Sequence, residues 1–318
     1  MKMKSLLKSS MFVAALLAGT SAYADTFTVD GIIYEALTET TCKVAKNGTS
    51  YSGALNIPST VTNEDVTYTV TEVGDDAFNG ATFVNGLTLP STIEKIGSTA
   101  FRYTNMAEVT IPENCTSIGN NAFDNCNKLT SVTILGPVKT VGDQAFFSNK
   151  VTKLVFPEGL ETVGFGAFGA MTSMTEIEFP STFKSIDMYA FMSDAALTKV
   201  TCKAVTPPTT YGPIFTTAIK ATLYVPKGSK DAYAAAMYWK DFPTIEEIET
   251  TGVEAVDAEG VKVVANGGVI NVAGAEGDVE VYNAAGQLLY KGADEAISVP
   301  AKGITIVKVG GKAVKVAL

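Results

Sequence analysis

The dipeptide Ala-Phe recurs along the middle of the chain, and its spacing constrains the fold more than any other feature. The phenylalanines, separated by 22 or 23 residues, are Phe78, Phe101, Phe123, Phe146, Phe168 and Phe191. An aliphatic residue stands five positions before each one, and in five of the six units it is followed by a glycine, which we expect to let the chain turn. This period predicts a solenoid, because one such unit buries its apolar face only against neighbouring coils. The Ala-Phe pair is expected to fill the interior.

Each unit also contains a short segment in which apolar and other residues alternate. These segments are residues 87–90, 109–112, 132–134, 154–157, 177–180 and 200–202. Alternation over so few residues predicts a short strand with its outer residues buried and its middle residue in water. Several of the segments end in proline, which has no N–H to donate to a ladder. We therefore expect one strand per coil, stacked into a parallel sheet.

The middle residues of these strands form an outward row, which continues into a later segment at Tyr224. Beside it runs a second row, made of Gly86, Glu108, Ser131, Lys153, Glu176, Lys199 and Thr222. Seven strands ~4.8 Å apart give a face about 30 Å long, which is large enough for a protein or a glycan partner. We predict ligand contacts at Thr88, Thr110, Thr133, Val155, Glu176, Glu178, Thr201 and Tyr224. The alternative is that threonine is there only as a good strand former.

Composition excludes several functions. The chain has 33 acidic and 24 basic residues, and Arg102 is its only arginine. It therefore lacks the basic patch that nucleic-acid binding requires. The absence of histidine excludes Ser-His and Cys-His nucleophile pairs and histidine-ligated metals. An enzyme that uses carboxylates alone would need a cleft, which a flat or convex solenoid does not offer. We predict no catalytic residue, no metal and no cofactor, so the protein is not expected to be an enzyme.

The N-terminus has the three parts of an export signal. Lys2, Lys4 and Lys8 precede the apolar stretch 11–18, and the small residues Ala22 and Ala24 mark a cleavage site after residue 24. No later run of apolar residues is long enough for a transmembrane helix. We expect residues 1–24 to be a signal peptide and the protein to be exported to the cell surface, to the outer membrane or into the medium.

The four cysteines are Cys42, Cys115, Cys126 and Cys202, with no C-x-x-C pair among them. Export permits disulfides, but an unpaired cysteine also serves as a small buried hydrophobe. Both interpretations stay open, with buried thiols preferred. Cys115 and Cys126 are the pair to test.

The repeats resemble the BspA-like leucine-rich repeat of bacterial surface proteins. Residues 118–134 follow its pattern I-G-x-x-A-F-x-x-x-x-x-L-x-x-V-x-I nearly throughout. Residues 25–34, with an Asp30-Gly31 turn, resemble the N-terminal capping hairpin, and residues 221–229, 232–233 and 239–242 resemble the closing cap. The resemblance implies an adhesin that binds a host matrix protein or other cells through the strands of the solenoid. The alternative is a glycan-binding surface protein that supports nutrient capture.

From about residue 250 the chain becomes rich in Gly, Ala and Val. Short β-like runs lie at 261–264, 269–272, 279–282, 287–290, 297–299, 304–309 and 313–316. They predict a small antiparallel β-sandwich. Residues 281–290 and 303–309 are similar to C-terminal sorting domains of type IX secretion, although Thr305 replaces the usual aromatic residue. A retained β domain is the other interpretation.

The expected fold is thus mainly β, a leucine-rich repeat solenoid followed by the sandwich. Its expected parts are a signal peptide at 1–24, an N-terminal β cap at 25–69, the solenoid with its closing cap at 70–249, and the C-terminal domain at 250–318.

Overall fold

A computed structural model describes most of the chain after the expected signal peptide. The described residues are 26–47, 54–81, 86–216, 220–248, 254–256, 262–266, 269–275, 277–283, 285–299, 304–309 and 312–317. The signal peptide predicted at 1–24 lies outside them. None of the helices in these ranges could span a lipid bilayer.

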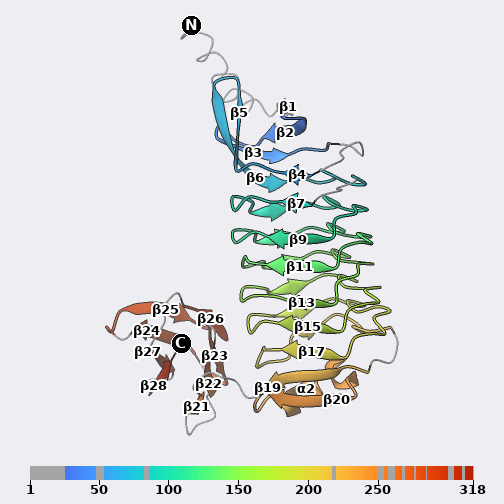
Figure 1. Ribbon diagram of the computed structural model, residues 1–318. Helices are drawn as coiled ribbons and strands as arrows, with labels where there is room; N and C mark the ends of the chain where they lie inside the picture. The colour runs from blue at the N-terminus through green and yellow to red at the C-terminus, as the bar shows by residue number, and fades with distance from the viewer. Residues whose placement is uncertain are drawn as a thin grey trace.

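The repeats form a solenoid whose coils stack from the N-terminal cap to the closing cap (Figure 1). One series of strands is the series predicted from the sequence, with one strand per coil. Neighbouring strands within its sheets pair in parallel. Its strands are β4 (Leu55–Asn56), β7 (Leu87–Thr88), β9 (Glu108–Ile111), β11 (Ser131–Ile134), β13 (Lys153–Val155), β15 (Glu176–Phe179), β17 (Lys199–Cys202), β19 (Thr222–Pro226) and β20 (Thr244–Ile248). The six strands predicted in the repeats are confirmed. β4 and β20 extend the series at its two ends, and β4 falls in the segment expected to be the N-terminal cap.

A second sheet lines the opposite side of the coils. It contains β1 (Thr26–Val29), β2 (Ile32–Ala36), β3 (Thr41–Val44), β5 (Thr60–Asn63), β6 (Val66–Val73), β8 (Lys95–Ile96), β10 (Ser117–Ile118), β12 (Thr140–Val141), β14 (Thr162–Val163), β16 (Ser185–Ile186) and β18 (Thr209–Thr210). The predicted Asp30-Gly31 turn joins β1 to β2, with φ values of 50° and 78°. The two-residue strands of this sheet were not predicted.

The glycines beside these short strands make close contact between coils possible. The N–H three residues further on donates to the carbonyl of Gly119, Gly142 and Gly164, so each glycine opens a turn, although none of the three has a positive φ. A Cβ on Gly119 or Gly142 would lie 2.6 Å from a backbone nitrogen of the preceding coil. Real Cβ atoms do not approach other atoms so closely. Glycine stands there because the backbones of successive coils touch.

The phenylalanines form a continuous stack inside the solenoid, as expected of the Ala-Phe pair. From Phe78 to Phe191, successive rings lie 5.2–6.2 Å apart with interplanar angles of 10–22°. All are at most 1% exposed. Each Phe N–H donates to a carbonyl of the next coil at 2.8–3.0 Å. Burial of one such side chain contributes about 1.5–3 kcal/mol, so the stack contributes strongly to the cohesion between coils.

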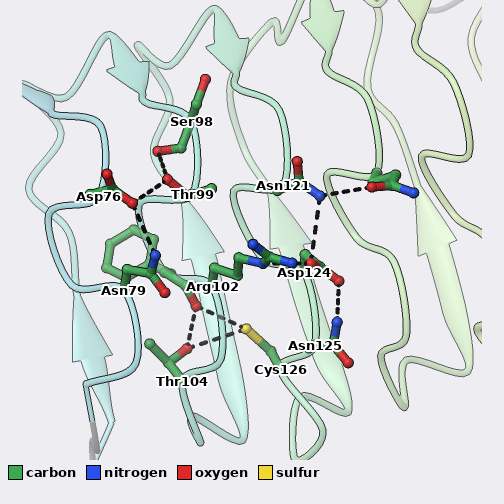
Figure 2. Close-up of polar contacts among 12 residues, drawn as sticks. Asp76, Asn79, Ser98, Thr99, Arg102, Thr104, Asn121, Asp124, Asn125 and Cys126 are labelled. Carbon is green, nitrogen blue, oxygen red and sulfur yellow. Dashed lines mark hydrogen bonds and ion pairs between the residues drawn. The ribbon is translucent and has the colours of Figure 1, made fainter. Parts of the chain in front are cut away.

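Polar side chains join neighbouring coils at the turns that contain Asp76, Thr99, Arg102 and Asp124 (Figure 2). Arg102 Nε donates to Asp124 Oδ2 of the next coil at 2.7 Å, and Asn125 Nδ2 donates to Asp124 Oδ1 at 2.6 Å. Asp124 is buried, so its charge requires these partners. The only arginine in the sequence therefore stabilises a contact between coils.

The C-terminal end of the solenoid is closed by α2 (Lys230–Ala235) and the 3-10 helix η1 (Trp239–Asp241). Tyr233 and Trp239 are buried there. The Tyr233 hydroxyl donates to the Ala204 carbonyl at 2.8 Å, and Trp239 Nε1 donates to the Pro208 carbonyl at 2.8 Å. Large aromatic side chains thus cover the end of the stack while their polar atoms stay bonded.

The C-terminal domain consists of two antiparallel sheets. One contains β21 (Glu254–Val256), β22 (Lys262–Asn266), β23 (Val269–Ala273) and β26 (Ala296–Ser298), and the other contains β24 (Val279–Asn283), β25 (Leu288–Gly292), β27 (Ile304–Val309) and β28 (Lys312–Ala317). Its core is made mostly of valine and isoleucine, including Val263, Ile270 and Val307. All seven predicted strands are found, and β21 is additional.

The glycine contacts predict a specific defect in stability. We expect Gly142→Ala to lower the free energy of unfolding by about 1–3 kcal/mol, because the added methyl group forces adjacent coils apart. Thr140→Ala, at the exposed residue of the strand β12 just before it, is the control and should change it by less than about 0.5 kcal/mol. Urea unfolding followed by circular dichroism measures both. Equal stability of the two variants would contradict the assignment.

Candidate functional site

The predicted ligand-binding residues lie on the first strand series, and we call their common surface the strand face. It comprises the outward residues of β7, β9, β11, β13, β15, β17 and β19. Thr88, Thr110, Thr133 and Val155 are exposed, with Val155 40% exposed. The parallel register places Thr110 beside Thr133, as the sequence pattern predicted. An uncharged, accessible row therefore occupies the N-terminal part of this face.

The C-terminal part of the strand face is less accessible than predicted. Glu178 and Tyr224 are half-buried, and Thr201, which was expected to be exposed, is only 4% exposed. Thr201 pairs with Glu178 on one side and Tyr224 on the other. Its short side chain lies between two long ones, so the expected exposure of Thr201 is wrong.

Alternating charges from neighbouring coils neutralise one another on this part of the face. Glu176 accepts from Lys199 at 2.8 Å and lies 3.1 Å from Lys153, while Glu178 pairs with Lys203. The hydrogen bond from Lys199 holds the pKa of Glu176 below its usual range, and the same bond raises the pKa of Lys199. Lys199 also lies 5.7 Å from the ring centre of Tyr224. Glu176 and Glu178 therefore do not form the uncompensated acidic pair that a cation would need.

The sequence did not predict a groove that lies on the second sheet. It is open, has a volume of about 590 Å³, and crosses β8, β10, β12, β14 and β16. Its lining includes Gly119, Gly142 and Gly164, which lack side chains at positions where no Cβ fits. The sequence signal for it is the aliphatic-Gly pair found in five of the six units, because a glycine leaves a gap in a row of side chains.

All four cysteines lie among the described residues, and all are free and buried. Cys115 Sγ contacts the Ser117 carbonyl, whereas Cys126 Sγ lies against Thr104 and the Phe101 carbonyl. The candidate pair Cys115–Cys126 is therefore not joined, because each sulfur is held by a different part of the coil. Burial raises the pKa of each thiol to about 11, which leaves them unreactive near neutral pH.

A column of buried residues follows the phenylalanines by three positions, and it carries polar groups inside the solenoid. Thr104 and Asn149 donate to the carbonyls of Phe101 and Phe146 at 2.7 and 3.0 Å. Asp194, 2% exposed, accepts from the Met171 N–H with Oδ1, while its Oδ2 has no partner among the described residues. Desolvation raises the pKa of Asp194 to about 8.

No group of three or more acidic, cysteine or histidine residues in the described ranges is arranged to hold a metal ion. On the strand face, Glu176 and Glu178 are paired with lysines. The site that the geometry offers is therefore two surfaces, the strand face and the groove.

The repeats match the model of a known protein family. The model of the BspA-type leucine-rich repeat region matches six copies over residues 54–168 and 139–210. The parallel coils thus define a leucine-rich repeat solenoid. Residues 54–210 of this chain therefore match the BspA-type repeat. No curated protein matches the chain.

Several solved structures are similar to the chain. A leucine-rich cell surface protein from Faecalibacterium prausnitzii is 15% identical, with 73% of this chain and 97% of that one covered and a TM-score of 0.35. A leucine-rich repeat protein from T. pallidum is 17% identical, with 72% and 81% covered and a TM-score of 0.38. One from Bacteroides capillosus is 22% identical, with 56% and 98% covered and a TM-score of 0.31.

The buried Asp194 predicts a pH-dependent stability. Its carboxyl is neutral in the folded chain up to about pH 8, whereas in the unfolded chain it ionises near pH ~4. The contribution of the neutral carboxyl to the free energy of unfolding is therefore fully present below pH ~4 and is lost as pH rises toward 8. Relative to wild type, we expect Asp194→Asn to gain a few kcal/mol (~2–5) over this range.

Urea unfolding at several pH values measures this difference. Asp65→Asn, at an exposed residue, is the control and should follow wild type. A constant difference between Asp194→Asn and wild type from pH 4 to 8 would contradict the burial of a neutral acid.

Proposed function

We propose that this protein is an exported, non-enzymatic binding protein that holds a protein partner through the strand face. The observation that supports it most is the uncharged exposed row of Thr88, Thr110, Thr133 and Val155 on strands fixed by the coil stack. A rigid, regularly spaced surface loses little entropy when a partner binds. Solenoids commonly bind through such extended surfaces.

The pairs of Glu176 and Glu178 with lysines favour a partner contact at the N-terminal rather than the C-terminal part of the strand face. A partner at Glu176 would have to replace the lysines already bound to it. The row from Thr88 to Val155 has no such pairs and needs only the removal of water. We therefore place the contact on β7, β9, β11 and β13.

Glycan capture on this same face is the second candidate, and the structure disfavours it. Binding to sugar rings uses exposed aromatic side chains, and Tyr224 is the only aromatic residue in the two outward rows. It is half-buried and lies beside the ammonium group of Lys199. The strand face therefore suits a protein better than a sugar chain.

Export and presentation at the surface are supported by the N-terminal sequence and by the repeat family. The absence of histidine supports a non-enzymatic role. The domain limits at residues 24, 69 and 249 stay predictions. So does the type IX sorting role of residues 250–318.

The experiment is an array of extracellular-matrix proteins and glycans probed with residues 25–318. We expect saturable binding to a matrix protein. Thr133→Arg should weaken it at least tenfold, because a bulky charge then stands in the centre of the exposed row. Thr162→Arg, on the opposite sheet, is the matched control and should bind as wild type does.

Binding that survives Thr133→Arg unchanged would exclude the strand face. A response confined to glycans would replace the protein-binding role. Circular dichroism establishes that both arginine variants keep the fold.

A further inference from the structure

We infer that the groove on the second sheet is a binding site for a linear, uncharged polysaccharide, separate from the strand face. The groove crosses β8, β10, β12, β14 and β16, and Tyr211 lies at its C-terminal end. The inference is independent of the protein partner proposed above, because the two surfaces use different sheets.

The floor of the groove results from contact between the coils. Glycine occupies the same position in successive coils, at Gly119, Gly142 and Gly164, because a Cβ there would meet the backbone of the coil before. The coils that follow have Asp187 and Tyr211 at this position. The row of glycines along the groove therefore ends at the carboxylate of Asp187 and the aromatic ring of Tyr211.

One wall of the groove presents a regular row of hydroxyl groups. Ser117, Thr140, Thr162 and Ser185 are the first residues of consecutive short strands and stand side by side in register. Their hydroxyls have no hydrogen-bond partner among the described residues. The row offers one donor and acceptor per coil, at a spacing of ~4.8 Å.

Tyr211 supplies the apolar contact that sugar recognition requires. Its side chain is 65% exposed and lines the groove, although an exposed aromatic ring has unfavourable contact with water. The flat C–H face of a sugar ring can cover it. Asp187 lies in the preceding coil and also lines the groove, where its carboxylate can accept hydrogen bonds from sugar hydroxyls.

A peptide fits this groove less well. The backbones of the short strands are already paired with their neighbours, so a peptide cannot join the sheet here. The groups on one face of an extended peptide repeat every ~6.6 Å, which does not match the hydroxyl row. A polysaccharide presents hydroxyls on every ring and needs no sheet edge.

The charge of the groove favours a neutral ligand. Asp75, Lys95 and Asp187 are the charged residues in its lining, so it has a slight excess of negative charge. The whole chain has a formal net charge of −9. Anionic polymers would be repelled, whereas an uncharged sugar chain would not.

The test is affinity electrophoresis of residues 25–318 in gels that contain soluble xylan, cereal β-glucan or galactomannan. We expect at least one of these to retard the protein. Tyr211→Ala should weaken the interaction at least tenfold, and Thr162→Arg should abolish it by filling the groove. Tyr103→Ala removes another exposed tyrosine, 53% exposed and outside the groove, and should stay within twofold of wild type.

Retardation by none of the three polysaccharides would overturn the inference. Equal effects of Tyr211→Ala and Tyr103→Ala on polysaccharide binding would also overturn it. So would binding of a lysine-rich peptide to the wild-type protein that is lost in the Thr162→Arg variant. Thr133→Arg should leave polysaccharide binding unchanged, so that failure at this site and failure at the strand face are told apart.

Discussion

Contact between successive coils at the phenylalanine stack is the interaction on which the rest of the structure depends. Each ring lies against the rings of the coils before and after it, and each Phe N–H bonds to the next coil. No coil can keep its phenylalanine buried alone. Between the coils that contain Gly119, Gly142 and Gly164, glycine also allows the close approach of the two backbones, because a Cβ there would meet the preceding coil.

The stacking of the coils produces both surfaces of the solenoid. On one side it lines up Thr110 and Thr133 in an exposed row and brings lysines to both sides of Glu176. On the other side the glycine positions leave a groove that ends at Tyr211. Function on either surface therefore follows from a repeated contact in the interior, and a defect in that contact would disturb both surfaces.

The period made the strands and the buried phenylalanines predictable, because every unit repeats the same apolar positions. The second sheet was missed, since a strand of two residues such as Ser117–Ile118 has no alternation to detect. The burial of Thr201 depends on the length of its neighbours Glu178 and Tyr224, which a single strand does not reveal. The ion pairs around Glu176 could be predicted from the sequence, because Lys153, Glu176 and Lys199 alternate in sign in one outward row.

Hydrogen exchange followed by mass spectrometry tests the central role of the stack most directly. The amides of Phe101, Phe123 and Phe146 each donate to the next coil from within the stack. We predict that peptides with these amides exchange more slowly than those of the closing helix α2, and that they lose protection together as urea is added. Exchange of the phenylalanine amides as fast as that of α2, or separately in each coil, would contradict the account.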